Sequence, residues 1–264
     1  MPFAQPGQTH SPYLKQIASV GSIGVWLMDG AIIRRDHDID FTNFGQAPWY
    51  DLPPDEMWID DVNGLVPNEW VFYLENMIAQ RQALQDGQSK EEARQTGNRI
   101  ELELRWQQGG HAVHKPLPAD YLQSVVQLKQ LGQDPNGVPV WLVSGRDVRD
   151  LSGYVDWVEG GNDMRYRFQP KPSIWVDDQT CQKEWPFFIR HESHERDKMA
   201  HGMAYGPAHK DANRIELDMR RAIDDGEYQR WLRYFKIKTA PFLGDAPRQM
   251  TSQIQTPTPS SVRR

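Results

Sequence analysis

The sequence predicts an α+β protein made of two similar halves that pack against each other as a pseudo-dimer within one chain. Two observations predict it. Segments of the first half recur about 115 residues later in the same order, and each half combines short β segments rich in Trp, Ile and Val with helical segments. The recurring segments are Val25–Gly30 with Val140–Gly145, Met57–Asp61 with Ile174–Asp178, Glu69–Leu74 with Glu184–Ile189, and Asn98–Leu102 with Asn213–Leu217. Four collinear matches indicate an internal duplication.

Each half is expected to begin with a short amphipathic helix, followed by two β segments that form a hairpin. The helices are expected over residues 12–20 and 119–131, the first β segments over Gly24–Arg34 and Val138–Ser144, and the second over Glu56–Asp60 and Ser173–Asp177. Met28–Gly30 and Val143–Asp147 are expected to form turns.

Two helices joined at a glycine are expected to complete each half. In the C-terminal half the first runs from about Lys183 to His201, and Gly202 suits the left-handed conformation that follows a helix. The second begins at Gly206-Pro207, since proline is favoured at the first helical position, and continues to residues 224–226. A further short helix is expected over Glu227–Lys236.

These segments define the predicted domain organisation. Residues 12–107 form a degenerate copy that acts as a scaffold, residues 108–118 a linker, and residues 119–244 the copy that binds metal. Residues 1–11 and 245–264 are expected to be disordered tails. Matched tryptophans, such as Trp58 and Trp175, are expected in the core or between the copies.

Composition excludes several classes of protein. The chain has 264 residues and a formal charge of −6, which does not favour a nucleic-acid partner. Its only cysteine, Cys181, excludes an intrachain disulfide and a zinc site built on cysteines. No apolar segment is long enough to span a bilayer, and the N-terminal residues do not resemble a signal peptide. We therefore expect a soluble, cytoplasmic protein.

The two halves differ at the residues that could perform chemistry. The C-terminal half carries His191, Glu192, Glu195, Tyr205 and His209. The matching positions of the N-terminal half are Asn76, Met77, Gln80, Lys90 and Arg94, which are poor metal ligands or none. A purely structural role would predict that both halves keep such side chains.

The spacing of these residues predicts a metal site. His191 and Glu195 are four residues apart on one helix, so that they share a face, and His209 lies on the next helix. Two imidazoles and a carboxylate are a typical ligand set for catalytic zinc, with a fourth position left for water. Glu192 follows the first ligand, as does the general base of His-Glu-x-x-His metallohydrolases. Tyr205 is a candidate for stabilising an oxyanion.

Several alternatives stay open. The cluster could be a solvated, charged helix face instead of a metal site. His194 could replace Glu195 as a ligand or be exposed. Glu216 could be a ligand, but Glu101 matches it in the N-terminal half, so that a structural role is equally compatible. In the N-terminal half, Arg94 could form an ion pair with Glu101 in place of a metal.

The C-terminal half resembles a group of poorly characterised phage and bacterial zincin-like proteins. The resemblance covers residues 140–236 and comprises an IWID-like strand (Ile174–Asp177), an HExxE helix from His191 and a YxxAHxxAxxxE helix from Tyr205. It implies that His191, Glu195 and His209 are ligands and Glu192 the base. Glu195 stands where better-known zincins carry a second histidine.

The interpretation is a hydrolase with a single metal, zinc or another divalent ion, acting on a peptide or a small polar substrate. The extended segment 174–178 could pair with a peptide substrate as an added strand. The alternative is a non-catalytic virion or host-interaction protein with a structural or vestigial metal site. A third possibility is a two-metal site that also uses Glu192 and Glu216. A phage protein of this kind would act in the cytoplasm of the host.

Overall fold

The computed structural model describes residues 11–61, 69–109, 118–223 and 226–236. Within these ranges the protein is α+β, with two four-stranded mixed sheets, one in each half. The N-terminal half contains β1 (Tyr13–Val20), β2 (Ile23–Met28), α1 (Gly30–Asp36), β3 (Phe44–Gln46), β4 (Glu56–Asp60), α2 (Glu69–Gln85) and α3 (Lys90–Gly109). The C-terminal half contains α4 (Ala119–Val126), β5 (Gln127–Gln133), β6 (Pro139–Val143), α5 (Gly145–Ser152), β7 (Gly160–Asn162), β8 (Ile174–Asp177), α6 (Trp185–Ala200), α7 (Tyr205–Arg221) and α8 (Glu227–Tyr234).

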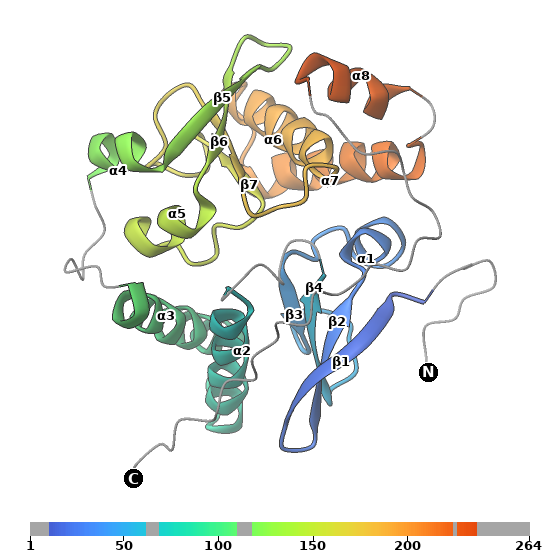
Figure 1. The fold of residues 1–264 in the computed structure, drawn as a ribbon, viewed down its shortest axis with the longest axis vertical. Helices are drawn as coiled ribbons and strands as arrows, with labels where there is room; N and C mark the ends of the chain where they lie inside the picture. Colours follow the sequence, from blue (N-terminus) through green and yellow to red (C-terminus); the bar gives the residue numbers. More distant parts are fainter. Residues whose placement is uncertain (1–10, 62–68, 110–117, 224–225, 237–264) are drawn as a thin grey trace.

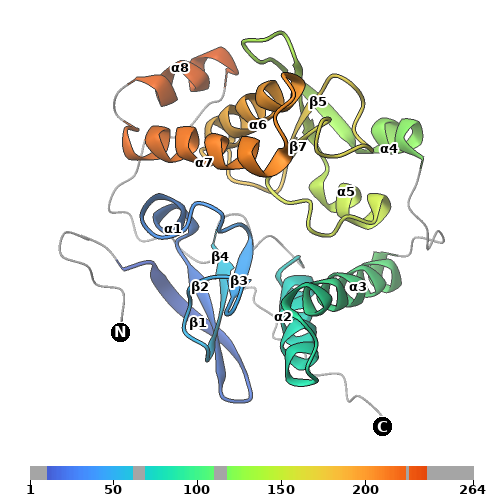
Figure 2. The same ribbon diagram turned by 180° about the vertical axis from the view of Figure 1, so that it is seen from behind.

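The two sheets have the same topology. The strand orders are β1-β2-β4-β3 and β5-β6-β8-β7, and in each the central pair is parallel while the outer pairs are antiparallel. The central pairs align Trp26 with Trp58 and Trp141 with Trp175. Figure 1 shows the halves one above the other, and Figure 2 shows them from behind.

Helices cover both faces of each sheet, which explains why the central strands are apolar without interruption. Val140, Ile174 and Val176 face α6 and α8, whereas Val143 and Trp175 face α4 and α5. The N-terminal sheet is packed in the same way, with α2 on one face and Ile33 of α1 on the other. Trp58 and Trp175 lie in the core of their own halves.

Several local predictions were wrong. Residues 13–20 form β1 instead of a helix, and the helix predicted over 119–131 ends at Val126, where β5 begins. Leu14, Ile17 and Ala18 have helical spacing, but pairing with β2 decides the conformation, and register shifts disrupt the alternation typical of a strand.

The predicted first β segment, Gly24–Arg34, ends at Met28, and the expected turns are helix starts. The side chains of Asp29 and Ser144 accept hydrogen bonds from backbone N–H groups of α1 and α5 as N-caps. The connection from β2 to β4 contains α1 and β3, and that from β6 to β8 contains α5 and β7, so that the paired strands are parallel and do not form the predicted hairpins.

The later helices agree more closely with their predictions. α6 and α8 occupy the expected segments, and Gly202 has a φ of +93° after α6. α7 ends at Arg221, before the predicted residues 224–226. Residues 108 and 109 of the predicted linker belong to α3, and most of the predicted tails lie outside the described residues.

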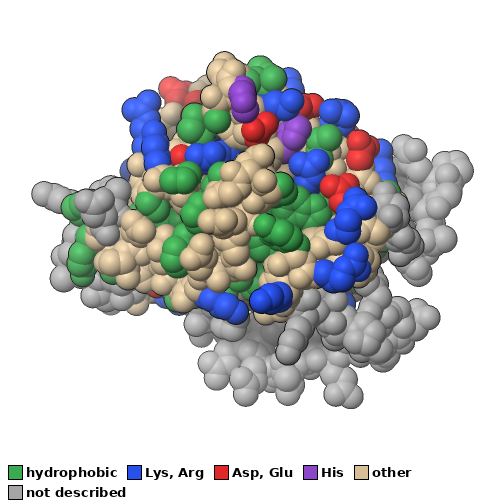
Figure 3. All heavy atoms as spheres, turned by 90° about the horizontal axis from the view of Figure 1, so that it is seen from above, with side chains coloured by type: hydrophobic (Ala, Val, Ile, Leu, Met, Phe, Trp, Pro, Cys, Tyr) green, Lys and Arg blue, Asp and Glu red, His purple; other side chains and the backbone are tan. Residues whose placement is uncertain are grey.

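Charges of both signs are interspersed on the face seen in Figure 3, with apolar and neutral side chains between them. No broad patch of one sign covers this face. Among the described helices, none combines the length and apolar character needed to cross a membrane.

Buried ion pairs join the two halves reciprocally. Arg34 of α1 lies 3.1 Å from Glu184, at the start of α6, and Arg149 of α5 lies 3.2 Å from Glu69, at the start of α2. Residues 34 and 69 match residues 149 and 184, so that each half gives an arginine to the other and receives one. This is the pattern of the interface in a two-fold dimer.

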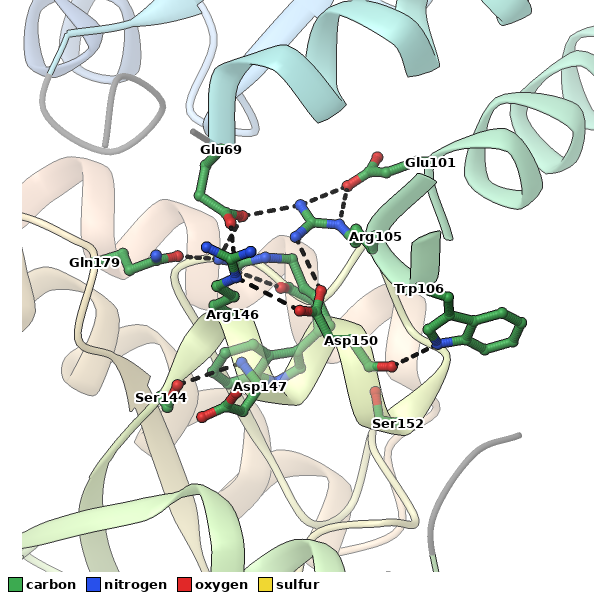
Figure 4. A network of polar contacts seen from close by, with 12 residues as sticks. Glu69, Glu101, Arg105, Trp106, Ser144, Arg146, Asp147, Asp150, Ser152 and Gln179 are labelled. Carbon is green, nitrogen blue, oxygen red and sulfur yellow. Dashed lines mark hydrogen bonds and ion pairs between the residues drawn. The ribbon is translucent and has the colours of Figure 1, made fainter. Parts of the chain in front are cut away.

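A second arginine in each half completes the network. Arg105 of α3 contacts Glu69 at 2.9 Å and Glu101 at 2.8 Å, whereas Arg220 of α7 contacts Glu184 at 2.8 Å and Glu216 at 2.7 Å. Figure 4 shows Glu69, Glu101 and Arg105 meeting α5 at the interface. Burial makes each of these charges dependent on its partners.

Removing one carboxylate should therefore destabilise the protein strongly. Glu69→Gln and Glu184→Gln each leave two buried guanidinium groups short of a partner, and each should lower the free energy of unfolding by about 3–5 kcal/mol. Urea unfolding measures this change. Glu103→Gln, which removes an exposed pair with Arg99, is the control and should cost less than about 1 kcal/mol. A large loss in only one of the two interface variants would contradict the reciprocal arrangement.

The same carboxylates predict the response to acid. Burial raises the pKa of Glu69 and Glu184, but the neighbouring arginines outweigh burial, and the pKa of both lies below its ordinary value. Their contribution is complete above the unfolded pKa of about 4.3 and is lost as the pH falls through the folded pKa. The Tm should fall below about pH 4, and less steeply in the Glu69→Gln/Glu184→Gln double variant. Equal losses of Tm in both proteins would exclude these carboxyls as the cause.

Candidate metal centre

His191, Glu195 and His209 meet between α6 and α7. His191 and Glu195 lie one turn apart on α6 and are buried, whereas His209 lies in the second turn of α7 and is half-buried. The turn at Gly202 brings α7 back along α6, so that residues 18 positions apart come into contact. These side chains line a cavity of about 320 Å³.

One atom of each side chain converges on the same point. Nε2 of His191 lies 3.2 Å from Nδ1 of His209 and 3.6 Å from Oε2 of Glu195, and the last two atoms are 2.9 Å apart. Ligand atoms of tetrahedral zinc, at bond lengths of about 2.0–2.1 Å, are separated by about 3.3 Å. The triangle therefore has the dimensions of three zinc ligands.

Each of the three side chains has a second partner on its opposite atom. Nδ1 of His191 lies 2.9 Å from Glu216, and Nε2 of His209 lies 3.0 Å from Asp40. Oε1 of Glu195 accepts a hydrogen bond of 2.8 Å from Asn162. A carboxylate behind a ligating histidine fixes the tautomer and the orientation of its ring.

Asp40 comes from the N-terminal half. It follows α1, and its carboxylate accepts hydrogen bonds from both His209 and Asn213 of α7. The N-terminal half, which lacks matching histidines, therefore contributes Asp40 to the surroundings of His209. Asp156 makes the reciprocal contact, at 3.3 Å from Arg94, which matches His209.

The carboxyl groups of the site differ in their pKa. Burial raises the pKa of Glu195, but hydrogen bonds from His191 and His209 outweigh it and lower the pKa to about 2. Burial and the charge of Glu195 raise the pKa of Glu192 to about 7. Hydrogen bonds with Asp40 and Glu195 raise the pKa of His209 to about 9. One carboxyl is thus held ionised, while its neighbour titrates near neutral pH.

Glu192 lines the same cavity as the three converging side chains. The amide of Asn162 donates to Glu192 at 2.8 Å and holds it beside Glu195. Asn162 ends β7, so that the edge strand of the sheet positions both carboxylates.

Three other candidates occupy different positions. His194 lies 2.8 Å from Asp211, outside the cluster. Glu216 contacts Nδ1 of His191 and Arg220, behind the converging atoms. The ring of Tyr205 stacks on that of His209 with 5.4 Å between centroids. The guanidinium of Arg165 also lies over the Tyr205 ring, at 4.1 Å from its centroid. A role for Tyr205 in catalysis stays a prediction.

The matching position in the N-terminal half is filled by amides. Asn76 donates to Glu101 at 2.6 Å, and Gln80 donates to Asn76 at 2.5 Å. The predicted ion pair between Arg94 and Glu101 was wrong, because Arg94 binds Glu91 and Asp156 while Glu101 binds Arg105. Glu101 keeps the structural contact to arginine that Glu216 makes in the other half.

Sequence reasoning missed Asp40 and Asn162. Asp40 is 169 residues from His209, and no local pattern connects them. The repeat could have identified Asn162, because it places an amide side chain, Gln46, at the matching position. Gln46 donates to Gln80 as Asn162 donates to Glu195. The prediction that a peptide substrate could add as a strand to segment 174–178 was wrong, since β8 already lies between β6 and β7.

No protein-family model matches the chain, and no curated protein or solved structure is similar to it.

The asymmetry of the halves predicts one metal per chain. His209→Ala should lower the metal content sharply, because it removes a ligand. Arg94→Ala, its matched control in the N-terminal half, should leave the metal content unchanged, because a guanidinium repels a cation and is no ligand. Elemental analysis of protein purified without added metal measures both. Two equivalents of tightly held metal, one of them lost in a Gln80 variant, would overturn the assignment.

Proposed function

We propose that this protein is a zinc-dependent hydrolase with peptidase-like activity and a single metal in its C-terminal half. The observation that carries the proposal is the triangle formed by His191, His209 and Glu195, whose edges of 2.9, 3.2 and 3.6 Å suit a tetrahedral metal. Two histidines and a carboxylate leave the fourth position for water, as in catalytic zinc sites.

The outer carboxylates support a cation at this point. Glu216 favours a proton on Nδ1 of His191, and Asp40 favours a proton on Nε2 of His209. A cation at this point would displace the protons that the two rings share with Glu195, and the neutral rings would then direct their remaining lone pairs to it. A divalent cation satisfies all three lone pairs at once.

Glu192 is the proposed general base. A zinc ion in the triangle would supply a water of lowered pKa and a Lewis acid for a carbonyl oxygen. Glu192 lines the same cavity and is outside the triangle, so that its carboxylate is available to accept the proton of that water. Asn162 would orient Glu192 for this step.

The charge of the cavity favours a neutral or cationic substrate, such as a peptide, over a phosphate ester. Among the described residues that line it, six are acidic and one is an arginine. These are Asp40, Asp156, Glu159, Glu192, Glu195, Glu216 and Arg165. Burial raises the pKa of Glu159 to about 8 and that of Glu192 to about 7, but the other four carboxylates still outnumber Arg165, and this surplus of negative charge disfavours phosphate groups. β7 is the last strand of its sheet and contributes Gly160 to the cavity wall, so that an extended peptide bound in the cavity would pass beside it.

The proposal includes an internal duplication. The shared strand order, the shared register shifts and the matched arginine network are what two copies of one unit would retain. The N-terminal copy would have lost its ligands while keeping its role at the interface.

The central test is Glu192→Gln. This variant should keep one equivalent of zinc and lose hydrolysis of casein and internally quenched peptides by roughly 100-fold or more, because only the proton acceptor is removed. Asp197→Asn, five residues further along α6 and outside the cavity, is the control and should keep both. Loss of the metal in Glu192→Gln would make Glu192 a ligand, and sustained hydrolysis would remove it from the mechanism. A wild-type protein that holds zinc without hydrolysing any peptide would overturn the assignment as an enzyme.

A further inference from the structure

A second cavity, of about 330 Å³, lies in the N-terminal half beside the one at the metal centre. The two cavities share three wall residues, Asp40, Thr42 and Asp156. The hydroxyl of Tyr50, in the wall of the second cavity, donates to the backbone carbonyl of Asp40 at 3.1 Å. The backbone of Asp40 is therefore held by a residue of the second cavity, while its side chain contacts His209 in the first.

The second cavity is the counterpart of the first in the N-terminal half. The backbone N–H of Asp60 donates to the carbonyl of Asn43, and that of Asp177 donates to the carbonyl of Glu159. These equivalent bonds show which residues of β3 and β7 correspond. By this match Tyr50 corresponds to Tyr166, and both line their cavities. The second cavity is thus bounded by residues equivalent to those that bound the cavity of the proposed metal centre.

Its chemistry is different. Met77 replaces Glu192, Gln80 replaces Glu195, and Trp49 replaces Arg165, while Phe44 stands where β7 has Gly160. Each change removes a charge or adds apolar surface. The remaining cation, Arg94, is paired with Glu91 at 2.7 Å and with Asp156 at 3.3 Å, so that its charge is already compensated. Such a wall suits a bulky uncharged group.

We propose that this second cavity is a substrate pocket that selects a large apolar side chain, aromatic above all, of a peptide whose backbone reaches the metal centre. Phe44 and Trp49 would contact that side chain, since aromatic walls bind aromatic rings well. The shared wall at Thr42 places the pocket next to the reacting position. The peptide as substrate rests on the proposed hydrolase function, whereas the selectivity of the pocket rests on its own walls.

The experiment measures binding separately from hydrolysis. Acetylated, amidated hexa-alanine peptides with one central residue changed to Phe, Trp, Leu, Lys or Glu are titrated by calorimetry against zinc-loaded Glu192→Gln protein, and their hydrolysis is measured with the wild type. Peptides with Phe or Trp should bind roughly tenfold or more tightly than hexa-alanine, from burial of the ring. Those with Glu or Lys should show no such gain.

Two pocket variants should change this preference in opposite ways. Trp49→Ala enlarges the pocket and should reduce the advantage of Phe over Ala at least several-fold. Asn98→Trp fills the pocket and should abolish binding of the aromatic peptides selectively, while hexa-alanine binds as before. Tyr121→Ala, at an exposed tyrosine outside both cavities, is the control and should change nothing.

The outcomes separate the two proposals. Aromatic preference without any hydrolysis would support the pocket and contradict the hydrolase. Hydrolysis without preference for bulky apolar side chains, or a preference that persists unchanged in both pocket variants, would overturn the pocket and leave the hydrolase standing.

Discussion

Arg34 and Arg149 each form an ion pair with a buried glutamate at the start of a helix in the other half of the molecule. Glu184 begins the stretch that carries His191 and Glu195 on α6, and the same carboxylate binds Arg220 of α7. Arg220 in turn binds Glu216, which contacts His191. A continuous line of charge-assisted contacts therefore runs from the interface to the first predicted ligand, and it fixes α6 and α7 relative to each other.

The corresponding line in the N-terminal half runs through Arg149, Glu69, Arg105 and Glu101, and it ends at Asn76 instead of a histidine. The two halves thus share the parts that hold helices together and differ at the last residue. The division is physical: a buried charge that loses its partner is costly, so the network is retained, whereas a metal ligand can be exchanged for an amide that bonds to the same carboxylate. The N-terminal half still contacts the proposed metal centre, because Asp40 lies 3.0 Å from Nε2 of His209.

The repeat allowed much of this to be predicted from sequence. It located β4, β8 and α6, and it singled out His191, Glu195 and His209 by contrast with Asn76, Gln80 and Arg94. It did not predict α1 and α5, because these segments are short and resemble turns in sequence. Only the structure shows that the side chains of Asp29 and Ser144 cap the two helices. β1 was mistaken for a helix because strand pairing, and not local spacing, decides its conformation. Asp40 was beyond reach, since only the packing of the two halves brings it to His209.

The most direct test of the account is an anomalous diffraction map, recorded on both sides of the zinc absorption edge, from crystals of protein purified without added metal. A single metal in the C-terminal half should give one strong peak per chain, within about 2.2 Å of Nε2 of His191, Nδ1 of His209 and an oxygen of Glu195, and no peak beside Asn76 and Gln80. A map without a peak between α6 and α7, or with one coordinated by His194 or by the N-terminal half, would contradict it.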